Sequence, residues 1–195
     1  MRPLKISPAV VTIDSLPDEI LRRILSLVTT KEAVATGILS KRWIHLWRSV
    51  STIDFTGIRV DNIKSICLLN EFIDSVLASR DAAAGGSNFI NTFLFDIYYR
   101  DADHARYSSF PYILKWLNLV LQHRLQHLRL RLDLRTPRWV NIDHFLPTLP
   151  ISIFTCTTLV SLDLCWFRVD LDVRFLRIYE RLIYTSIMRK FLVVL

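Results

Sequence analysis

The apolar residues near the start of the chain recur at helical spacing. Between residues 20 and 28 they fall at positions i, i+1, i+4, i+5 and i+8, which places them on one wide stripe of a helix. This stripe is formed by Ile20, Leu21, Ile24, Leu25 and Val28. Pro17 suits the first position of this helix, where its missing N–H group is not needed. Asp18 and Glu19 then lie in the first turn, where the helix dipole favours negative charge.

Two further short helices are predicted before residue 50. Thr30 can cap a second helix with a body over residues 31–39. Ser40 can cap a third helix, on which Trp43 and Trp47 lie four residues apart and share a face. We therefore expect a compact cluster of three short helices in this part of the chain.

Beyond residue 50, strand and helix patterns alternate. Period-two alternation and runs of β-branched or aromatic residues predict strands at residues 50–55, 89–98, 125–134 and 159–164. Apolar residues three to four apart predict helices at residues 63–79 and 111–122. Polar, glycine-rich or proline-rich stretches predict loops at residues 81–88, 100–109 and 135–150. The strand centres are roughly 35 residues apart, with helices or long loops between them, and this spacing favours parallel pairing through right-handed crossovers.

These elements predict an α+β or α/β fold in four segments. Residues 1–12 form a tail, and residues 13–50 form the helical cluster. Residues 51–172 form an irregular leucine-rich-repeat-like solenoid of parallel strands and helices, because strand–helix units with Leu-x-Leu strands repeat loosely. Residues 173–195 form a divergent C-terminal tail that does not continue this repeat.

We expect no membrane segment and no signal peptide. The first residues lead into no long apolar run. A spanning helix needs about 20 predominantly apolar residues. The most apolar candidate, residues 175–195, is interrupted by Arg177, Glu180, Arg181, Arg189 and Lys190.

Composition and charge narrow the class of protein. Of the 195 residues, 51% are hydrophobic and 22% are charged, which favours a folded chain with a sizeable core. The net charge of +7 is spread along the chain. Arg129 and Arg131 alternate with leucines, which indicates a half-buried strand with a solvated basic face. A phosphate-contacting face is the alternative, although no aromatic residues are interleaved there to stack on bases.

The chain lacks the usual marks of catalysis or metal binding. It contains no G-x-G-x-x-G, Walker A or G-x-S-x-G motif. His123 and His127 lie four apart, but no glutamate follows the first histidine as in a zinc-protease helix, so we interpret both as structural. We therefore expect no enzyme activity, cofactor or metal. The three cysteines are Cys67, Cys156 and Cys165; they are far apart and expected to be reduced, which fits the nucleus or the cytoplasm.

The helical cluster carries more apolar surface than a unit of about 40 residues can shield by itself. This surface can pack on the rest of the chain, or it can dock a partner protein. The motifs favour the second alternative. Residues 16–25 read LPDEILRRIL, residues 30–36 read TKEAVAT, and residues 39–47 read LSKRWIHLW. Together they resemble an F-box, and more narrowly the N-terminus of plant F-box, FBD and leucine-rich-repeat proteins.

The resemblance continues to about residue 172 through motifs in the family's order. They are Ile53-Asp54-Phe55, the helix segment EFIDSVL at residues 71–77, Trp116-Leu117, and LPISIFTCTTLVSLDL at residues 149–164. The chain departs from the family at Thr29, where proline is usual, and at Gly37, where serine or cysteine is common. After Val173 the family's repeats do not continue.

The resemblance implies a non-catalytic, substrate-recognition adaptor of an SCF-type cullin–RING ubiquitin ligase. Its F-box would bind the Skp-type adaptor and through it a cullin, and the repeat region would hold an unknown protein substrate. Lys41 and Arg42 would help to steer the encounter with an acidic adaptor. The adaptor-binding positions implied are Leu16, Pro17, Ile20, Leu21, Ile24, Leu25, Val34, Leu39, Trp43, Leu46 and Trp47. Some of these side chains must also hold the helices together.

Two other functions stay open on the residues alone. The chain can be a truncated F-box protein without a working substrate site, acting as a competitor or a decayed copy. It can also be a basic nucleic-acid-binding protein, although the spread of its charge argues against this role.

Overall fold

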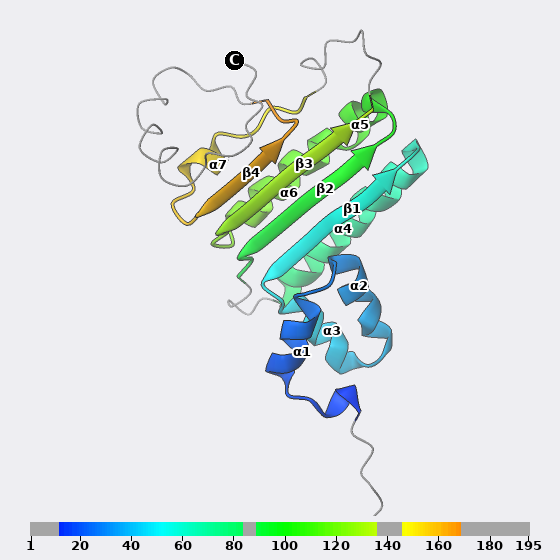
Figure 1. The fold of residues 1–195 in the computed structure, drawn as a ribbon, viewed down its shortest axis with the longest axis vertical. Helices are drawn as coiled ribbons and strands as arrows, with labels where there is room; N and C mark the ends of the chain where they lie inside the picture. Colours follow the sequence, from blue (N-terminus) through cyan, green and yellow to red (C-terminus); the bar gives the residue numbers. More distant parts are fainter. Residues whose placement is uncertain (1–11, 84–88, 136–145, 169–195) are drawn as a thin grey trace, which may run out of the picture.

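The computed structural model describes residues 12–83, 89–135 and 146–168. Within these ranges, a cluster of short helices stands at one end of a parallel β-sheet, and further helices run along the sheet (Figure 1). The predicted tail over residues 173–195 lies outside the described residues, as do residues 1–11 of the predicted N-terminal tail. Parts of the loops predicted at residues 81–88 and 135–150 also lie outside them.

Each stretch predicted as helix before residue 50 contains an α-helix. The elements are η1 (Ile13–Ser15), α1 (Asp18–Leu25), α2 (Thr30–Ala35), η2 (Thr36–Ile38) and α3 (Lys41–Arg48). Pro17 is the N-cap of α1 and not, as predicted, its first residue. The second predicted helix is divided, because α2 gives way to the 3-10 turn η2 at Thr36.

The cap of α2 is Thr29 and not the predicted Thr30. The Thr29 hydroxyl accepts a hydrogen bond from the backbone N–H of Glu32 at 3.4 Å, and the Glu32 carboxylate accepts one from the backbone N–H of Thr29 at 2.9 Å. This reciprocal pair is a capping box. The Thr30 side chain is buried and accepts instead from the backbone N–H of Asp54 at 2.7 Å. Thr30 therefore connects α2 to the first strand.

The sheet contains four described strands in sequential order. They are β1 (Thr52–Val60), β2 (Thr92–Tyr99), β3 (His127–Leu134) and β4 (Ser161–Cys165), and neighbouring strands pair in parallel. The predicted parallel pairing is therefore confirmed. In register, Phe55 pairs with Phe95, Phe95 with Leu130, and Leu130 with Leu164. Such rows of buried side chains explain why the inward positions of all four strands are apolar.

The first strand is longer than predicted. The pattern ends at Phe55, whereas β1 continues to Val60 after a register shift between Phe55 and Ile58. Gly57 lies within the shift and has a φ of 71°, a conformation that costs little only for glycine. A glycine in a sequence pattern often indicates the end of a strand. Here Gly57 instead lies in an irregularity of β1, and the strand continues beyond it.

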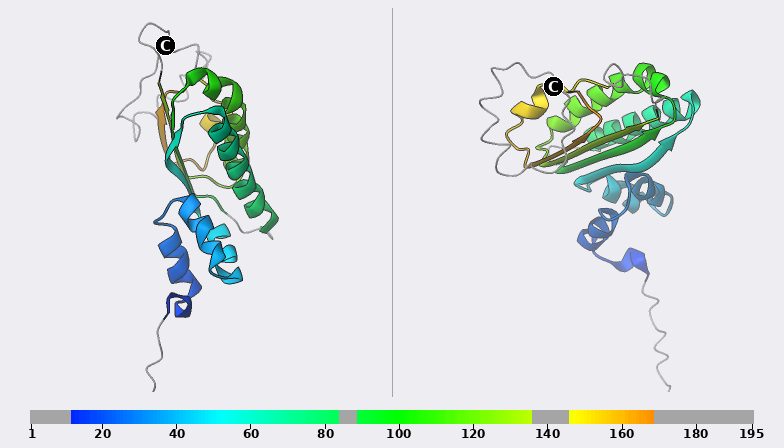
Figure 2. Two further views of the ribbon diagram at one scale, coloured as in Figure 1. Left: turned by 90° about the vertical axis from the view of Figure 1, so that its right-hand side faces the viewer. Right: turned by 45° about the horizontal axis from the view of Figure 1, so that its top comes forward.

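Helices cover one face of the sheet (Figure 2). They are α4 (Ile63–Ala83), α5 (Ala102–Ser108), α6 (Phe110–Leu121) and α7 (Ser152–Thr155). Their inner residues meet the strands in a core rich in aromatic rings; the ring of Phe95, for example, lies 6.0 Å from that of Trp116. The opposite face of the sheet carries the more polar half of each strand, so the alternation predicted from sequence corresponds to one covered and one open face.

Helix α5 corrects the prediction of a polar loop at residues 100–109. The Asp101 side chain caps it by accepting from the backbone N–H of His104 at 3.0 Å, and Ala102 and Ala105 are buried. A helix of seven residues with only two small inward side chains has too weak a periodic signal to be found by pattern alone. The four-residue α7 was not predicted for the same reason.

Two of the family-like motifs meet in the helical layer. Asp74 of α4 accepts hydrogen bonds from the indole N–H of Trp116 on α6 at 2.7 Å and from the Lys115 ammonium at 2.9 Å. The aspartate in EFIDSVL and the tryptophan in Trp116-Leu117 are therefore partners that fasten α4 to α6. The continuation of these units as a leucine-rich-repeat solenoid, and the segment boundaries, stay predictions.

Candidate docking site

The inward side chains of α1, α2 and α3 pack together and belong to the same hydrophobic core as the strands and the helices of the sheet. The side chains that face inward are Leu21, Leu25, Ala33, Trp43, Leu46 and Trp47, and all are buried. On α1 the inward positions Leu21 and Leu25 are four residues apart, and the partly buried Val28 after the helix packs against the same core, so this side of α1 holds the cluster together.

The segment before α1 is fastened to α3. The Arg42 guanidinium donates to the carboxylate of Asp18 at 2.8 Å, to the carbonyl oxygen of Leu16 at 2.7 Å and to the carbonyl oxygen of Asp14. The Trp43 indole N–H donates to the Asp14 carboxylate at 2.6 Å. Arg42 therefore holds the start of the module in place, which leaves its charge less available for steering a partner than we expected from sequence.

A second apolar stripe of α1 faces solvent. Ile20, Ile24 and Leu27 follow one another at spacings of four and three residues, and all three are exposed, Leu27 by 81%. The link between α2 and α3 adds Ile38, exposed by 91%, and Leu39. We call Ile20, Ile24, Leu27, Ile38 and Leu39 the exposed apolar set. These five large aliphatic side chains lie within residues 20–39 and are available for contact with another protein.

The eleven positions implied by the resemblance divide by burial. Pro17, Ile20, Ile24 and Leu39 are exposed, and Leu16 and Val34 are half-buried. The buried ones are Leu21, Leu25, Trp43, Leu46 and Trp47. Trp43 and Trp47, which share one face of α3 as predicted, both lie in the core of the module. Contact with the adaptor stays a prediction for the whole set.

Sequence reasoning missed Leu27 and Ile38. Leu27 lies just beyond the last residue of α1, but its spacing of seven residues from Ile20 and three from Ile24 is a signal that could have found it. Ile38 was placed inside a longer second helix, and only the 3-10 turn η2 turns it outward so far.

The open face of the sheet carries charges that are partly neutralised. The Asp163 carboxylate on β4 lies 2.6 Å from the Arg131 guanidinium and 3.3 Å from that of Arg129, both on β3. The hydrogen bond from Arg131 to Asp163 raises the pKa of the guanidinium above its ordinary value. The basic strand predicted from sequence thus shares an aspartate from its neighbour, which weakens the case for a phosphate-binding face.

The other candidate reactive groups are in ordinary surroundings. Burial raises the pKa of the Cys165 thiol, which keeps it in the unreactive protonated form. His127 Nδ1 lies 2.8 Å from the Ser161 hydroxyl, in a surface pair. Among the described residues, no three histidine, cysteine or acidic side chains gather as a metal site would require. No helix in the described ranges is long and apolar enough to cross a membrane.

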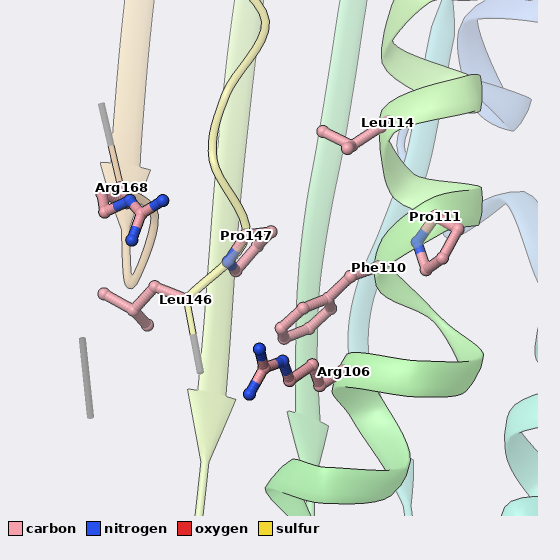
Figure 3. A pocket seen from close by; sticks show the side chains of 7 residues that line it. All are labelled: Arg106, Phe110, Pro111, Leu114, Leu146, Pro147 and Arg168. Atoms are coloured by element: carbon pink, nitrogen blue, oxygen red, sulfur yellow. The ribbon is translucent and has the colours of Figure 1, made fainter. Parts of the chain in front are cut away.

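A pocket of about 410 Å³ lies between the start of α6 and the segment that follows β4 (Figure 3). Figure 3 shows the two arginine side chains apart from each other, with Arg168 beside Leu146 and Arg106 beside the ring of Phe110. The lining residues are Arg106, Phe110, Pro111, Leu114, Leu146, Pro147 and Arg168. None of these side chains is a nucleophile or can exchange a proton near neutral pH.

Comparison with known protein families finds a match over the helical module at the start of the chain. Residues 13–54 match the F-box domain family. Most of the chain is also similar to proteins of Arabidopsis thaliana. It is 34% identical over 157 residues to the putative F-box protein At3g44060, a match that covers 77% of this chain and 32% of that protein.

Two further relatives carry more specific names. The chain is 31% identical over 155 residues to the F-box/FBD/LRR-repeat protein At1g51370, covering 79% of this chain and 29% of that protein. It is 32% identical over 152 residues to the FBD-associated F-box protein At1g60410, a match that covers 78% of this chain and 33% of that protein. The chain thus spans about a third of the length of these relatives. No solved structure matches it at a significant level. The similarities confirm the resemblance that the motifs indicated.

Proposed function

We propose, from the premise that this chain carries an F-box domain and is related to plant F-box/FBD/LRR-repeat proteins, that it is a substrate-recognition subunit of an SCF-type cullin–RING ubiquitin ligase. F-box domains generally bind Skp-type adaptors, and F-box proteins generally act as non-catalytic substrate adaptors. In this role the module at residues 13–54 docks on the adaptor and through it on a cullin. The chain then works in the nucleus or the cytoplasm.

The exposed apolar set is the observation that carries this proposal. Its five aliphatic side chains lie on α1, on the residue that follows the C-cap of α1, and on the link before α3, while Leu21 and Leu25 of α1 hold the module together. Covering one fully exposed leucine or isoleucine contributes roughly 1.5–3 kcal/mol, as an upper range. A partner that covers several of them therefore gains enough free energy for specific binding after the costs of association.

The open face of the sheet supports a second part of the proposal, which is that this region holds the target protein. It combines apolar and charged groups in neighbouring rows. The Arg59 guanidinium lies 4.6 Å from the ring centre of Tyr98, and Arg129 and Arg131 flank Asp163. Such a mixed surface suits a protein target better than a polyanion, because no unbroken band of positive charge is present on these described strands.

Binding of the full chain to a purified Skp-type adaptor tests the docking role. We expect Ile20→Glu and Leu39→Glu each to weaken binding at least tenfold, because each places a charge where an apolar contact forms. Leu68→Glu is the matched control, since Leu68 is as exposed as Leu39 but lies on α4, outside the module. Melting temperatures of all variants are expected to stay close to that of the wild type. Failure of the wild-type chain to bind, or equal weakening by Leu68→Glu, contradicts the proposal.

The ligase role is tested by affinity purification from the native source. The proposal expects the adaptor, a cullin and a target protein in the same complex, and loss of all three with Ile20→Glu. Recovery of adaptor and cullin without any target whose ubiquitination depends on this chain would favour the competitor or decayed copy.

A further inference from the structure

A buried arginine lies where the F-box module meets the sheet and its helices. Arg80, near the end of α4, is only 3% exposed. Its guanidinium donates to the carbonyl oxygen of Val50 at 2.5 Å and to that of Trp47 at 3.4 Å. Both acceptors belong to the last turn of α3 or the residues directly after it.

The end of α3 is a favourable place for this cation. The last carbonyl groups of a helix have no partner within the helix, and they carry the negative end of its dipole. Burying an arginine is costly unless its donors are paired and its charge is compensated. The hydrogen bonds from Arg80 to Val50 and Trp47 form only while α3 keeps its present position against α4. The contact therefore penalises any rotation of the module away from the sheet.

Two other hydrogen bonds join the same two parts from different directions. The Arg48 guanidinium of α3 donates to the Ser79 hydroxyl of α4 at 3.1 Å. The Thr30 hydroxyl of α2 accepts from the backbone N–H of Asp54 on β1 at 2.7 Å. One contact alone leaves the module free to pivot, whereas contacts made from α2 and from the end of α3 restrict all rotations.

We propose that Arg80 is a positioning residue that sets the angle between the F-box module and the sheet. The exposed apolar set and the open face of the sheet then keep a constant relative direction. The functional consequence rests on the ligase role proposed above. In a ligase, a target bound on the sheet would be presented to the ubiquitin-transfer site at one orientation, and constant orientation raises the rate of such transfers.

The angle can be measured without any partner. Cys67 on α4 is exposed and takes a spin label directly, and Arg23→Cys adds a second site on the outside of α1. Cys156→Ser and Cys165→Ser remove the other thiols. Pulsed electron paramagnetic resonance on this full-length background gives the distribution of distances between α1 and α4.

Arg80→Met keeps much of the side-chain length but removes the donors and the charge. We expect it to widen the distance distribution at least twofold, and Arg80→Lys, which keeps the charge, to give an intermediate width. Arg59→Met is the control, because Arg59 lies on β1 away from the junction, and it should leave the width unchanged. Adaptor binding by Arg80→Met should stay within twofold of the wild type, since the exposed apolar set is unaltered.

An unchanged width in folded Arg80→Met overturns the proposal. So does loss of the α1–α3 fold itself in Arg80→Lys, because Arg80 would then be a folding residue of the module. If Arg80→Met does not fold, the double variant Ser79→Ala/Arg80→Lys takes its place in the test. If the width of its distance distribution equals that of the wild type, the positioning role is rejected. Absence of adaptor binding by the wild type would remove the ligase role but leave the distance measurement fully interpretable.

Discussion

Trp43 and Trp116 are almost fully buried, and each donates its indole N–H to an aspartate from a separate part of the chain. Trp43 of α3 bonds Asp14 at 2.6 Å, and Trp116 of α6 bonds Asp74 of α4 at 2.7 Å. A buried indole needs such a partner, because an unpaired N–H in the core loses its hydrogen bond to water without replacement. The family-like tryptophans therefore stabilise the fold through specific hydrogen bonds between elements as well as through burial of apolar surface.

At the residue scale, this pairing predicts the effect of Asp74→Ala. Removal of the carboxylate leaves the Trp116 N–H unpaired, and we expect a loss of about 1–3 kcal/mol in the free energy of unfolding. Urea denaturation of the full chain measures it. Lys115→Ala is the control, because it removes the exposed ion pair to Asp74 and a cation–π contact with Tyr112 but keeps the indole hydrogen bond, and it should cost less than about 1 kcal/mol. Equal losses for the two variants would show that the indole bond contributes little.

The helix caps show what can be recognised within a single element. The sequence predicts Thr30 as the cap of α2, and the cap is Thr29, one position earlier. Both threonines fit the cap chemically, and the choice follows from Glu32, which completes a capping box only with Thr29. The short α5 was missed although Asp101 caps it, because its two inward alanines give hardly any periodic signal. Long elements with many apolar positions were found with errors of a few residues at their ends.

At the element scale, the capping box of α2 predicts a pH dependence. The Thr29 hydrogen bonds hold the pKa of Glu32 below its ordinary 4.5. A carboxyl group with a lowered pKa in the folded state stabilises the fold above its ordinary pKa, and this contribution is lost as the pH falls through the lowered value. We expect Glu32→Gln to be less stable than the wild type at about pH 7, and the difference between them to be smaller at about pH 3.

Urea titrations of the wild type and Glu32→Gln at both pH values check this expectation. Thr29→Ala should cost about 1 kcal/mol through loss of the cap. A difference between wild type and Glu32→Gln that persists undiminished in acid would mean that the charge of Glu32 is not what stabilises α2.

The module and the sheet depend on each other across the whole molecule. Thr30 is hydrogen-bonded to β1, and the carbonyl oxygen of Val50 after α3 is hydrogen-bonded to Arg80 of α4, although these partners are far apart in sequence. An F-box match ending at residue 54 therefore does not mark a structurally independent unit. The part of the chain after it supplies contacts that hold the docking helices in place.

At the scale of the whole molecule, we predict that a fragment of residues 12–60 is less stable than the same helices in the full chain. The fragment keeps the inward core of α1–α3 and loses the contacts with α4. Hydrogen exchange of the α3 amides should be at least tenfold faster in the fragment, as followed by mass spectrometry. Equal protection in both would show that the module folds without support from α4.

The sequence alone determined the kind and order of the longer helices and strands and the parallel pairing, since these depend on the local spacing of apolar residues and on the length of chain between strands. It also carried the F-box motifs, because they are short and keep a constant order. Only the tertiary structure decided which apolar side chains of the module are enclosed and which are exposed, and it placed both Trp43 and Trp47 inside. It likewise paired Asp163 with Arg129 and Arg131, and Arg80 with the end of α3. These contacts join residues about 30 or more positions apart, and helical or strand periodicity carries no information about which distant elements meet.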